Sequence, residues 1–198
     1  MQVPGNDMDG LHYLRGIDDV LRIRRDLDSA RNVVIIGAGY IGLEVAAVTR
    51  QLGYDVSVVE MADRVMNRVV SPVVSDFYQA EHAVRGVNLM LSTALEMIEG
   101  ESRVNAVRTD GGHSLPADLV IAGIGIVPNT ELAASAGLEV NNGIVVDARC
   151  RTADPNIYAV GDCTSHPSGI YGRHVRLESV HNALEQAKTA AANICGET

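Results

Sequence analysis

Three glycines with a fixed spacing are the residues of this chain best suited to bind a ligand. Gly37, Gly39 and Gly42 follow the β-branched run 33–36 in a G-x-G-x-x-G pattern. In such a pattern the first glycine permits a tight turn out of a strand, the second lets the backbone approach a pyrophosphate, and the third allows close helix packing. The N–H groups and positive dipole end of the following helix then face the phosphates. The pattern predicts a dinucleotide site, and the alternative is a βαβ unit whose glycines serve packing alone.

A carboxylate at the end of the next expected strand indicates which dinucleotide binds. Glu60 follows the run 55–59. At this place an acid accepts the hydrogen bonds of an adenosine ribose and repels a 2′-phosphate. The sequence therefore predicts NAD(H) rather than NADP(H). Arg64 and Arg68 follow in a loop or short helix, where they either reach the cofactor's phosphates or face water.

Two later groups of residues are also placed to contact a ligand. Gly123 and Gly125 directly follow an expected buried strand, and such small residues let a cofactor or a crossing chain lie against the backbone. Asp162 follows Gly161 at the end of another expected strand, 157–160. An open α/β sheet places ligand contacts at such a position, and the alternative role for Asp162 is a simple strand-end cap.

An α/β fold is needed to position these residues. Between the expected strands 87–91 and 118–123, the segments 94–99 and 103–109 alternate loosely, and a turn at 110–112 precedes 113–115. This predicts an antiparallel meander instead of a helical crossover. A hinge bearing glycine and proline near residue 124 separates a Rossmann-like region, about 1–122, from a second region, about 123–198. Strands are expected at 33–36, 55–59, 87–91, 118–123, 138–140, 144–146 and 157–160, and helices at 18–27, 41–52, 73–85 and 180–194.

Composition excludes several functional classes. The chain has 198 residues and a net charge of −9, which argues against binding nucleic acid. It shows neither an export signal nor an apolar run long enough to span a membrane, so we expect a cytoplasmic protein with no membrane contact. The three cysteines are far apart, which predicts neither a redox-active dithiol nor a metal site. The six histidines lack ligand spacing and are expected at the surface or in packing.

Several motifs in register resemble those of one enzyme family. The resemblance extends over nearly the whole chain, which makes it more specific than any single motif. The chain resembles the flavin-dependent NADH:ferredoxin reductases of bacterial oxygenase and P450 systems, within the pyridine nucleotide–disulfide oxidoreductase superfamily. This implies NAD(H) and FAD as cofactors. The segments that carry the resemblance are 11–15, 17–19, 37–44, 123–129, 152–162 and 176–187.

The resemblance implies roles for individual residues. Tyr40 would cover the nicotinamide pocket beside the flavin, and Glu44, the acid of the family's G-x-G-x-x-G-x-E pattern, would lie close to both rings. Asp162 would hydrogen-bond the ribityl and phosphate region of the flavin. Val180 begins a helix whose N–H groups would point at the flavin pyrimidine, where reduced flavin carries negative charge. The candidate nucleotide contacts are Gly37, Gly39, Tyr40, Ile41, Gly42, Glu44, Glu60, Arg68, Gly123, Ile124 and Gly125.

The implied activity is hydride transfer from NADH to FAD, followed by transfer of single electrons to a [2Fe–2S] ferredoxin. Members of the family also contain an N-terminal unit for the FAD adenosine and a C-terminal interface domain. We expect this chain to lack both, so that 123–198 is an incomplete FAD-binding segment and the apolar surface left bare promotes self-association. An NADH oxidase, a reductase for another acceptor, and an NAD(H)-binding module without turnover are the alternatives.

Overall fold

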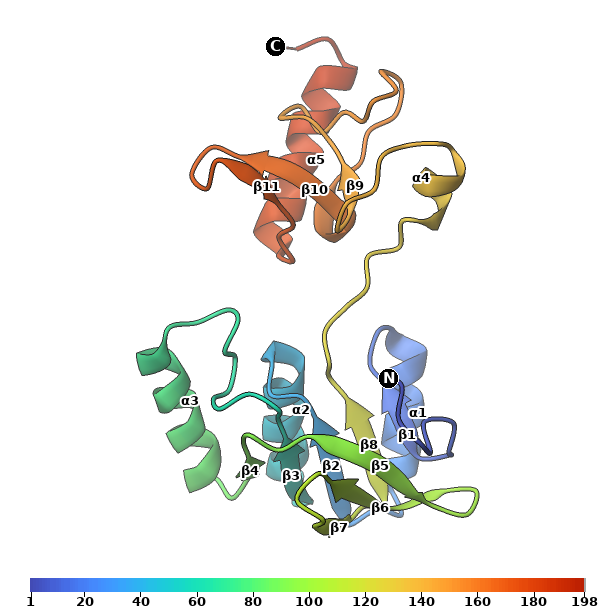
Figure 1. Cartoon of the computed structure of the whole chain (residues 1–198), viewed down its shortest axis with the longest axis vertical. Coiled ribbons are helices and arrows are strands. Elements are labelled where there is room, and N and C mark those ends of the chain that lie inside the picture. The colour runs from blue at the N-terminus through green and yellow to red at the C-terminus, as the bar shows by residue number, and fades with distance from the viewer. Residues whose placement is uncertain (198) are drawn as a thin grey trace. The chain divides into compact units, whose positions relative to one another are not determined.

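The chain folds into two compact units, Met1–Gly125 and Ile126–Thr198, which we call the first and the second unit. The computed structural model describes residues 1–197. Figure 1 shows the elements of both units with their labels. The boundary between the units lies between Gly125 and Ile126.

The first unit is built on a five-stranded parallel sheet with the strand order β1-β8-β2-β3-β4. A separate three-stranded antiparallel sheet, β5-β6-β7, forms the predicted meander. The parallel strands are β1 (Leu11–Tyr13), β2 (Asn32–Ile36), β3 (Asp55–Val59), β4 (Asn88–Met90) and β8 (Leu119–Ala122). The meander strands are β5 (Leu95–Gly100), β6 (Val104–Thr109) and β7 (Ser114–Pro116), and the helices are α1 (Ile17–Leu27), α2 (Tyr40–Gln51) and α3 (Pro72–Val84).

Both faces of the parallel sheet are buried. Val33 and Ile35 of β2 belong to a core cluster formed with α1 and α2. Val34 and Ile36, which point to the opposite face, belong to a second cluster formed with the meander strands. Because successive side chains of a strand alternate between faces, covering both faces requires the continuous β-branched run seen in the sequence.

The start of the chain differs from expectation in one respect. No strand is expected from the sequence before residue 33, whereas Leu11–Tyr13 forms the edge strand β1, parallel to β8. The turn into α1 is closed by Asp19, whose Oδ2 accepts hydrogen bonds from the backbone N–H groups of Arg15 and Gly16, both at 2.8 Å. An acid in the first helical turn thus satisfies donors that precede the helix.

Asp118 closes the amino-terminal edge of the parallel sheet. Its Oδ2 accepts hydrogen bonds from the backbone N–H groups of Arg31, at 3.0 Å, and Asn32, at 2.8 Å. It also accepts one from Asn32 Nδ2 at 3.1 Å. The backbone hydrogen bond from Asn32 is the main cause that lowers the pKa of Asp118, although burial opposes it. The charged carboxylate therefore ties β8 to the start of β2.

We expect Asp118→Asn to lower the free energy of unfolding by about 1–2 kcal/mol at neutral pH, because a charged acceptor makes stronger hydrogen bonds than an amide. Since the folded-state pKa lies below the unfolded value, this stabilisation is complete above the unfolded pKa and is lost as pH falls through the folded one. Chemical denaturation of wild type and variant should therefore converge once the pH falls below the folded-state pKa of Asp118. Asp76→Asn, on an exposed position of α3, is the control, and an equal loss there would contradict the assignment.

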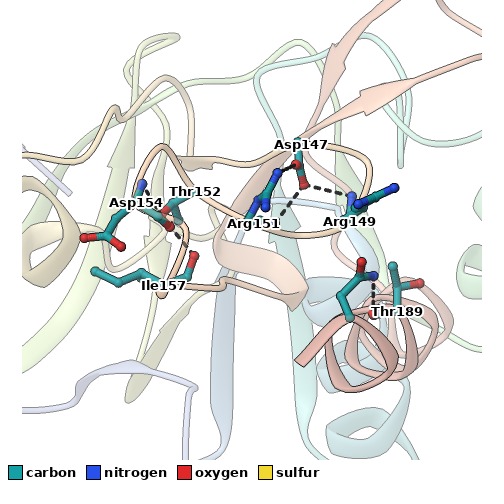
Figure 2. A network of polar contacts seen from close by, with 8 residues as sticks. Asp147, Arg149, Arg151, Thr152, Asp154, Ile157 and Thr189 are labelled. Atoms are coloured by element: carbon teal, nitrogen blue, oxygen red, sulfur yellow. Dashed lines mark hydrogen bonds and ion pairs between the residues drawn. The ribbon is translucent and has the colours of Figure 1, made fainter. Parts of the chain in front are cut away.

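The second unit contains a small sheet with the strand order β11-β10-β9 beside one long helix. A loop between β9 and β10 is held by its own polar contacts, and Figure 2 shows Asp147 among Arg149 and Arg151, with Thr152 near Ile157. The elements are α4 (Glu131–Ser135), β9 (Ile144–Val145), the 3₁₀ helix Gly161–Cys163, β10 (Thr164–Ser168), β11 (Arg173–Val175) and α5 (Val180–Ile194).

Two strand predictions for this unit are wrong. The segment 157–160 forms no strand: its backbone bonds back to the preceding loop, with Ala159 N–H donating to Cys150 O and Thr152 N–H to Ile157 O. The turn at Asp154 folds the chain onto itself there, so these groups are unavailable to a sheet. The segment 138–140 is limited to an isolated bridge to Ile144. The hairpin of β10 and β11 was not predicted at all.

Candidate functional site

The carboxyl ends of three parallel strands bring the predicted nucleotide contacts of the first unit together. Ile36 at the end of β2 pairs with Val59 of β3 and Ala122 of β8. The next residue of each strand is Gly37, Glu60 or Gly123. Ligands of open α/β sheets bind at this edge, so the register places one glycine cluster, the acid and the second glycine cluster where a dinucleotide is expected.

The backbones of Gly37, Gly42 and Gly123 pack against one another, and we call these three residues the glycine interlock. Gly37 has a φ of 98°, and a Cβ added there would lie 2.5 Å from Gly123 O. A Cβ on Gly42 would lie 1.9 Å from Gly37 O, and one on Gly123 would lie 3.2 Å from the Gly42 backbone. Glycine is required at the first two positions because real Cβ atoms do not approach backbone this closely.

Gly39 differs from the glycines of the interlock, because a Cβ built on it would meet no heavy atom of the described structure within 4 Å. It is the N-cap of α2, with extended backbone geometry. The start of a helix offers free N–H groups and a positive dipole end. Packing within the described residues therefore does not explain the glycine at this position, and the expected pyrophosphate contact stays a prediction.

The first turn of α2 presents three predicted contacts to solvent. Tyr40, Ile41 and Glu44 are all exposed, with 59% of the Tyr40 surface accessible. Tyr40 and Glu44 lie one helical turn apart, so their side chains share a face of the helix. The geometry leaves both side chains free to contact a ligand seated at Gly39.

Glu60 is held in place by backbone donors. Its Oε2 accepts a hydrogen bond from Ala38 N–H at 2.7 Å, and its Oε1 accepts one from Ala62 N–H at 2.8 Å. The carbonyl of Ala38 in turn accepts a hydrogen bond from Met66 N–H at 2.9 Å. Each carboxylate oxygen keeps a further lone pair for a ligand hydroxyl. The role of Glu60 as a brace of the glycine loop was not predicted.

The two arginines after Glu60 have different roles. Arg64 donates to Val70 O at 3.0 Å, to Ser75 Oγ at 2.8 Å and to Asn67 O at 2.7 Å. It is therefore a structural residue that closes its own loop, and the sequence suggested neither this nor its partner Ser75. Arg68 is exposed, and its Nη2 lies 3.5 Å from the position of a Cβ on Gly125. Of the two, Arg68 is the one placed beside the second glycine cluster.

The predicted flavin contacts lie together in the second unit. Asp162 is exposed within the 3₁₀ helix Gly161–Cys163, which precedes β10 and does not end a strand as expected. Val180 begins α5, and Ser179 caps this helix by accepting a hydrogen bond from Asn182 N–H at 3.2 Å. A Cβ on Gly161 would contact Ala183 Cβ at 3.6 Å, so the turn bearing Asp162 packs on the first turns of α5.

The histidines His12 and His82 have structural roles. His12 pairs with Asp26, with Nε2 and Oδ2 2.9 Å apart, and burial lowers the pKa of His82. Within residues 1–197, no three His, Cys, Asp or Glu side chains gather in a way that suits a metal ion. None of the helices in the same residues has the length and apolar character needed to cross a membrane.

A parallel sheet with this glycine loop defines the class of Rossmann-type α/β proteins. Comparison with known families identifies the particular group: a model of the pyridine nucleotide-disulphide oxidoreductase family matches residues 1–187. The chain belongs to this family. The α/β fold and the family expected from the sequence motifs are therefore both confirmed.

Individual members of the family are also similar to this chain over most of its length. Putidaredoxin reductase of Pseudomonas putida is 49% identical over 188 residues, covering 93% of this chain and 44% of the relative. A rubredoxin–NAD(+) reductase of Pseudomonas putida is 44% identical over 193 residues, covering 97% and 50%. A crystal structure of the covalent putidaredoxin reductase–putidaredoxin complex superposes with a TM-score of 0.93 at 46% identity, covering 98% and 47%. The chain spans about half the length of the curated relatives it matches.

Proposed function

We propose that the chain carries the NADH-binding domain and part of the FAD-binding domain of a ferredoxin reductase. The main support is the combination, at one sheet edge, of an open Gly39, a braced Glu60 and a glycine interlock. The names of the relatives support the electron-transfer class, since they are reductases of putidaredoxin and of rubredoxin. We assign the first unit to NADH and the second to FAD.

The residues of the first unit suit the parts of NADH in turn. Glu60 accepts hydrogen bonds from the ribose hydroxyls, and its negative charge disfavours a 2′-phosphate. Gly39 and the α2 N-terminus receive the pyrophosphate, and Arg68 adds positive charge beside Gly125. Tyr40 and Glu44 lie on the exposed face of the first helical turn, at the nicotinamide end. Close contacts along the nucleotide are assigned to Gly37, Ile41, Gly42, Gly123 and Ile124.

The second unit offers a hydrogen-bond acceptor and a helix end to a flavin. Asp162 accepts from hydroxyls of the ribityl chain, and the N–H groups at Val180 donate to the pyrimidine edge. The open, exposed turn at Asp162 fits these contacts. Bound FAD would supply acceptance of a hydride from NADH and release of single electrons to a [2Fe–2S] ferredoxin. The protein's part is to orient both rings and to stabilise the charge of the reduced one.

The second candidate function is an NAD(H)-binding module without turnover of its own. This function is favoured by the location of the candidate contacts, because every residue assigned to NADH lies in the first unit. This function requires only that unit to bind its ligand. The two functions differ in whether a flavin binds and reacts.

We expect NADH to bind at least about tenfold more tightly than NADPH, because a carboxylate facing a 2′-phosphate costs more than about 1.4 kcal/mol.

Absorption spectroscopy of the purified chain distinguishes the two functions. Added FAD should be retained through gel filtration, and its visible band should bleach on anaerobic addition of NADH. Retention without bleaching, or a colourless protein that binds NADH, would leave only the module. Equal affinity for NADPH would refute the assignment of Glu60. Ferredoxin and rubredoxin, compared as acceptors, then identify the partner.

A further inference from the structure

A buried glutamine of α5 contacts both ends of the turn that bears Asp162. Gln186 is 7% exposed, and its Oε1 lies 2.6 Å from Gly161 N and 3.0 Å from Thr164 Oγ. Thr164 Oγ is also 2.8 Å from Gly161 O. The amide oxygen of Gln186 therefore accepts a hydrogen bond from the N–H of Gly161 at the start of the turn. It also lies within hydrogen-bond distance of the fully buried hydroxyl of Thr164 at the end of the turn.

The turn needs such an external contact. Gly161–Cys163 is a 3₁₀ helix of 3 residues, and the Thr164 N–H bonds to Gly161 O at its end. Gly161 has a φ of 83°, and its N–H begins the turn, where no carbonyl within the turn can accept it. Without Gln186, this donor would be buried and unpaired. The exposed Asp162 side chain therefore depends for its position on an oxygen supplied by α5.

The other half of the Gln186 amide shows that stability alone does not explain this residue. Its Nε2 is buried and has no hydrogen-bond partner among residues 1–197. A buried unpaired donor costs about 1–3 kcal/mol. Methionine would fill a similar volume without that cost, whereas only a residue with an acceptor atom can bind Gly161 N–H. The glutamine is therefore suited to fixing one backbone conformation.

The loop that leads into the turn is held separately. Asp147 Oδ1 accepts hydrogen bonds from Arg149 N–H at 2.8 Å and Arg151 N–H at 2.9 Å, as Figure 2 shows. Thr152 Oγ1 lies 3.0 Å from Ile157 O in the same loop. None of these contacts involves Gln186. Removing the amide is therefore expected to release the turn without unfolding the loop.

We propose that Gln186 is a positioning residue that locks the Gly161–Cys163 turn to α5, so that Asp162 and the start of this helix form one rigid ligand-binding edge. The use of this edge for flavin rests on the function proposed above. The lock itself is a property of the second unit and is measurable without flavin.

The test compares Gln186→Met with Gln186→Glu, which keeps an acceptor oxygen, in the full chain. Amide hydrogen exchange followed by NMR should show Gly161 exchanging at least about tenfold faster in the Met variant. Amides in the middle of α5 should stay protected, and the Glu variant should retain most of the protection of Gly161. Where FAD binds, the Met variant should bind it at least about tenfold more weakly with NADH affinity unchanged.

A second pair of variants covers the case in which Gln186→Met fails to fold. Thr164→Val removes the hydroxyl between Gln186 and Gly161 O, whereas Thr164→Ser keeps it, so only the former should speed exchange at Gly161. Unchanged protection of Gly161 in Gln186→Met, or in Thr164→Val where Gln186→Met does not fold, would overturn the lock. Loss of protection in a chain that does not retain FAD would support the lock and refute the flavin assignment instead.

Discussion

Replacing Gly42 with alanine is expected to destabilise the first unit by about 3 kcal/mol and to abolish NADH binding, since overpacking a tight core costs about 1–3 kcal/mol or more. The new Cβ would lie 1.9 Å from the oxygen and 3.1 Å from the carbonyl carbon of Gly37. Both are backbone atoms of the turn that follows β2, and Gly123 also packs against the Gly42 backbone. The glycine loop would have to shift to accept the methyl group. Thermal unfolding and NADH titration measure the two effects.

Gly39→Ala is the matched control, because the same methyl group there meets no atom of the described structure within 4 Å. Its φ of −79° also suits alanine. We expect unchanged stability and a loss of NADH affinity of at least about tenfold, since the methyl group occupies the approach of the pyrophosphate. Wild-type stability and binding in Gly42→Ala would show that the interlock is not required. Unchanged NADH binding in Gly39→Ala would place the pyrophosphate elsewhere.

Glu60→Ala is expected to weaken NADH binding by about 10- to 100-fold, because hydrogen bonds to a charged acceptor contribute about 1.5–3 kcal/mol. The same change should lower stability by about 1–3 kcal/mol, since the N–H groups of Ala38 and Ala62 lose their acceptors. NADPH affinity should not rise by this change alone, because the glycine loop loses its brace. Fluorescence titration with each coenzyme, together with chemical denaturation, measures both effects.

A compensated variant tests the coenzyme preference directly. Met61 is 75% exposed and adjacent to Glu60, so Met61→Arg adds a cation where a 2′-phosphate would lie. The double variant Glu60→Gln, Met61→Arg keeps one acceptor oxygen at residue 60. It should prefer NADPH and lose less stability than Glu60→Ala. A persistent preference for NADH would show that residue 60 does not set coenzyme choice.

The strand and glycine loop at 32–42 could be predicted from sequence because their determinants are local. The spacing of the glycines after an apolar strand and the acid after the next strand need no tertiary information. The same holds for the helix expected at 180–194, because the cap residue Ser179 stands directly before its helical pattern. The meander was predictable from a glycine turn between two alternating segments.

Contacts that depend on tertiary geometry could not be predicted. The brace from Glu60 to Ala38 requires two strand ends to meet, and nothing in the sequence near residue 60 indicates it. Gln186 resembles a surface residue of an amphipathic helix, yet it is buried against Gly161. The apolar run 157–160 has strand-like composition, but its backbone is already bonded to the loop before it.

The glycine interlock also orders events during synthesis. Gly37 and Gly42 leave the ribosome long before Gly123, and β8 must insert between β1 and β2 before the third glycine arrives. Contacts between residues so distant along a chain form late in folding. Because the contacts of the glycine interlock are made by backbone atoms, no side chain can replace them before Gly123 is present. We therefore expect the proposed coenzyme to stabilise only the finished domain by mass action, and a nascent chain that ends before β8 to gain no protection from NADH.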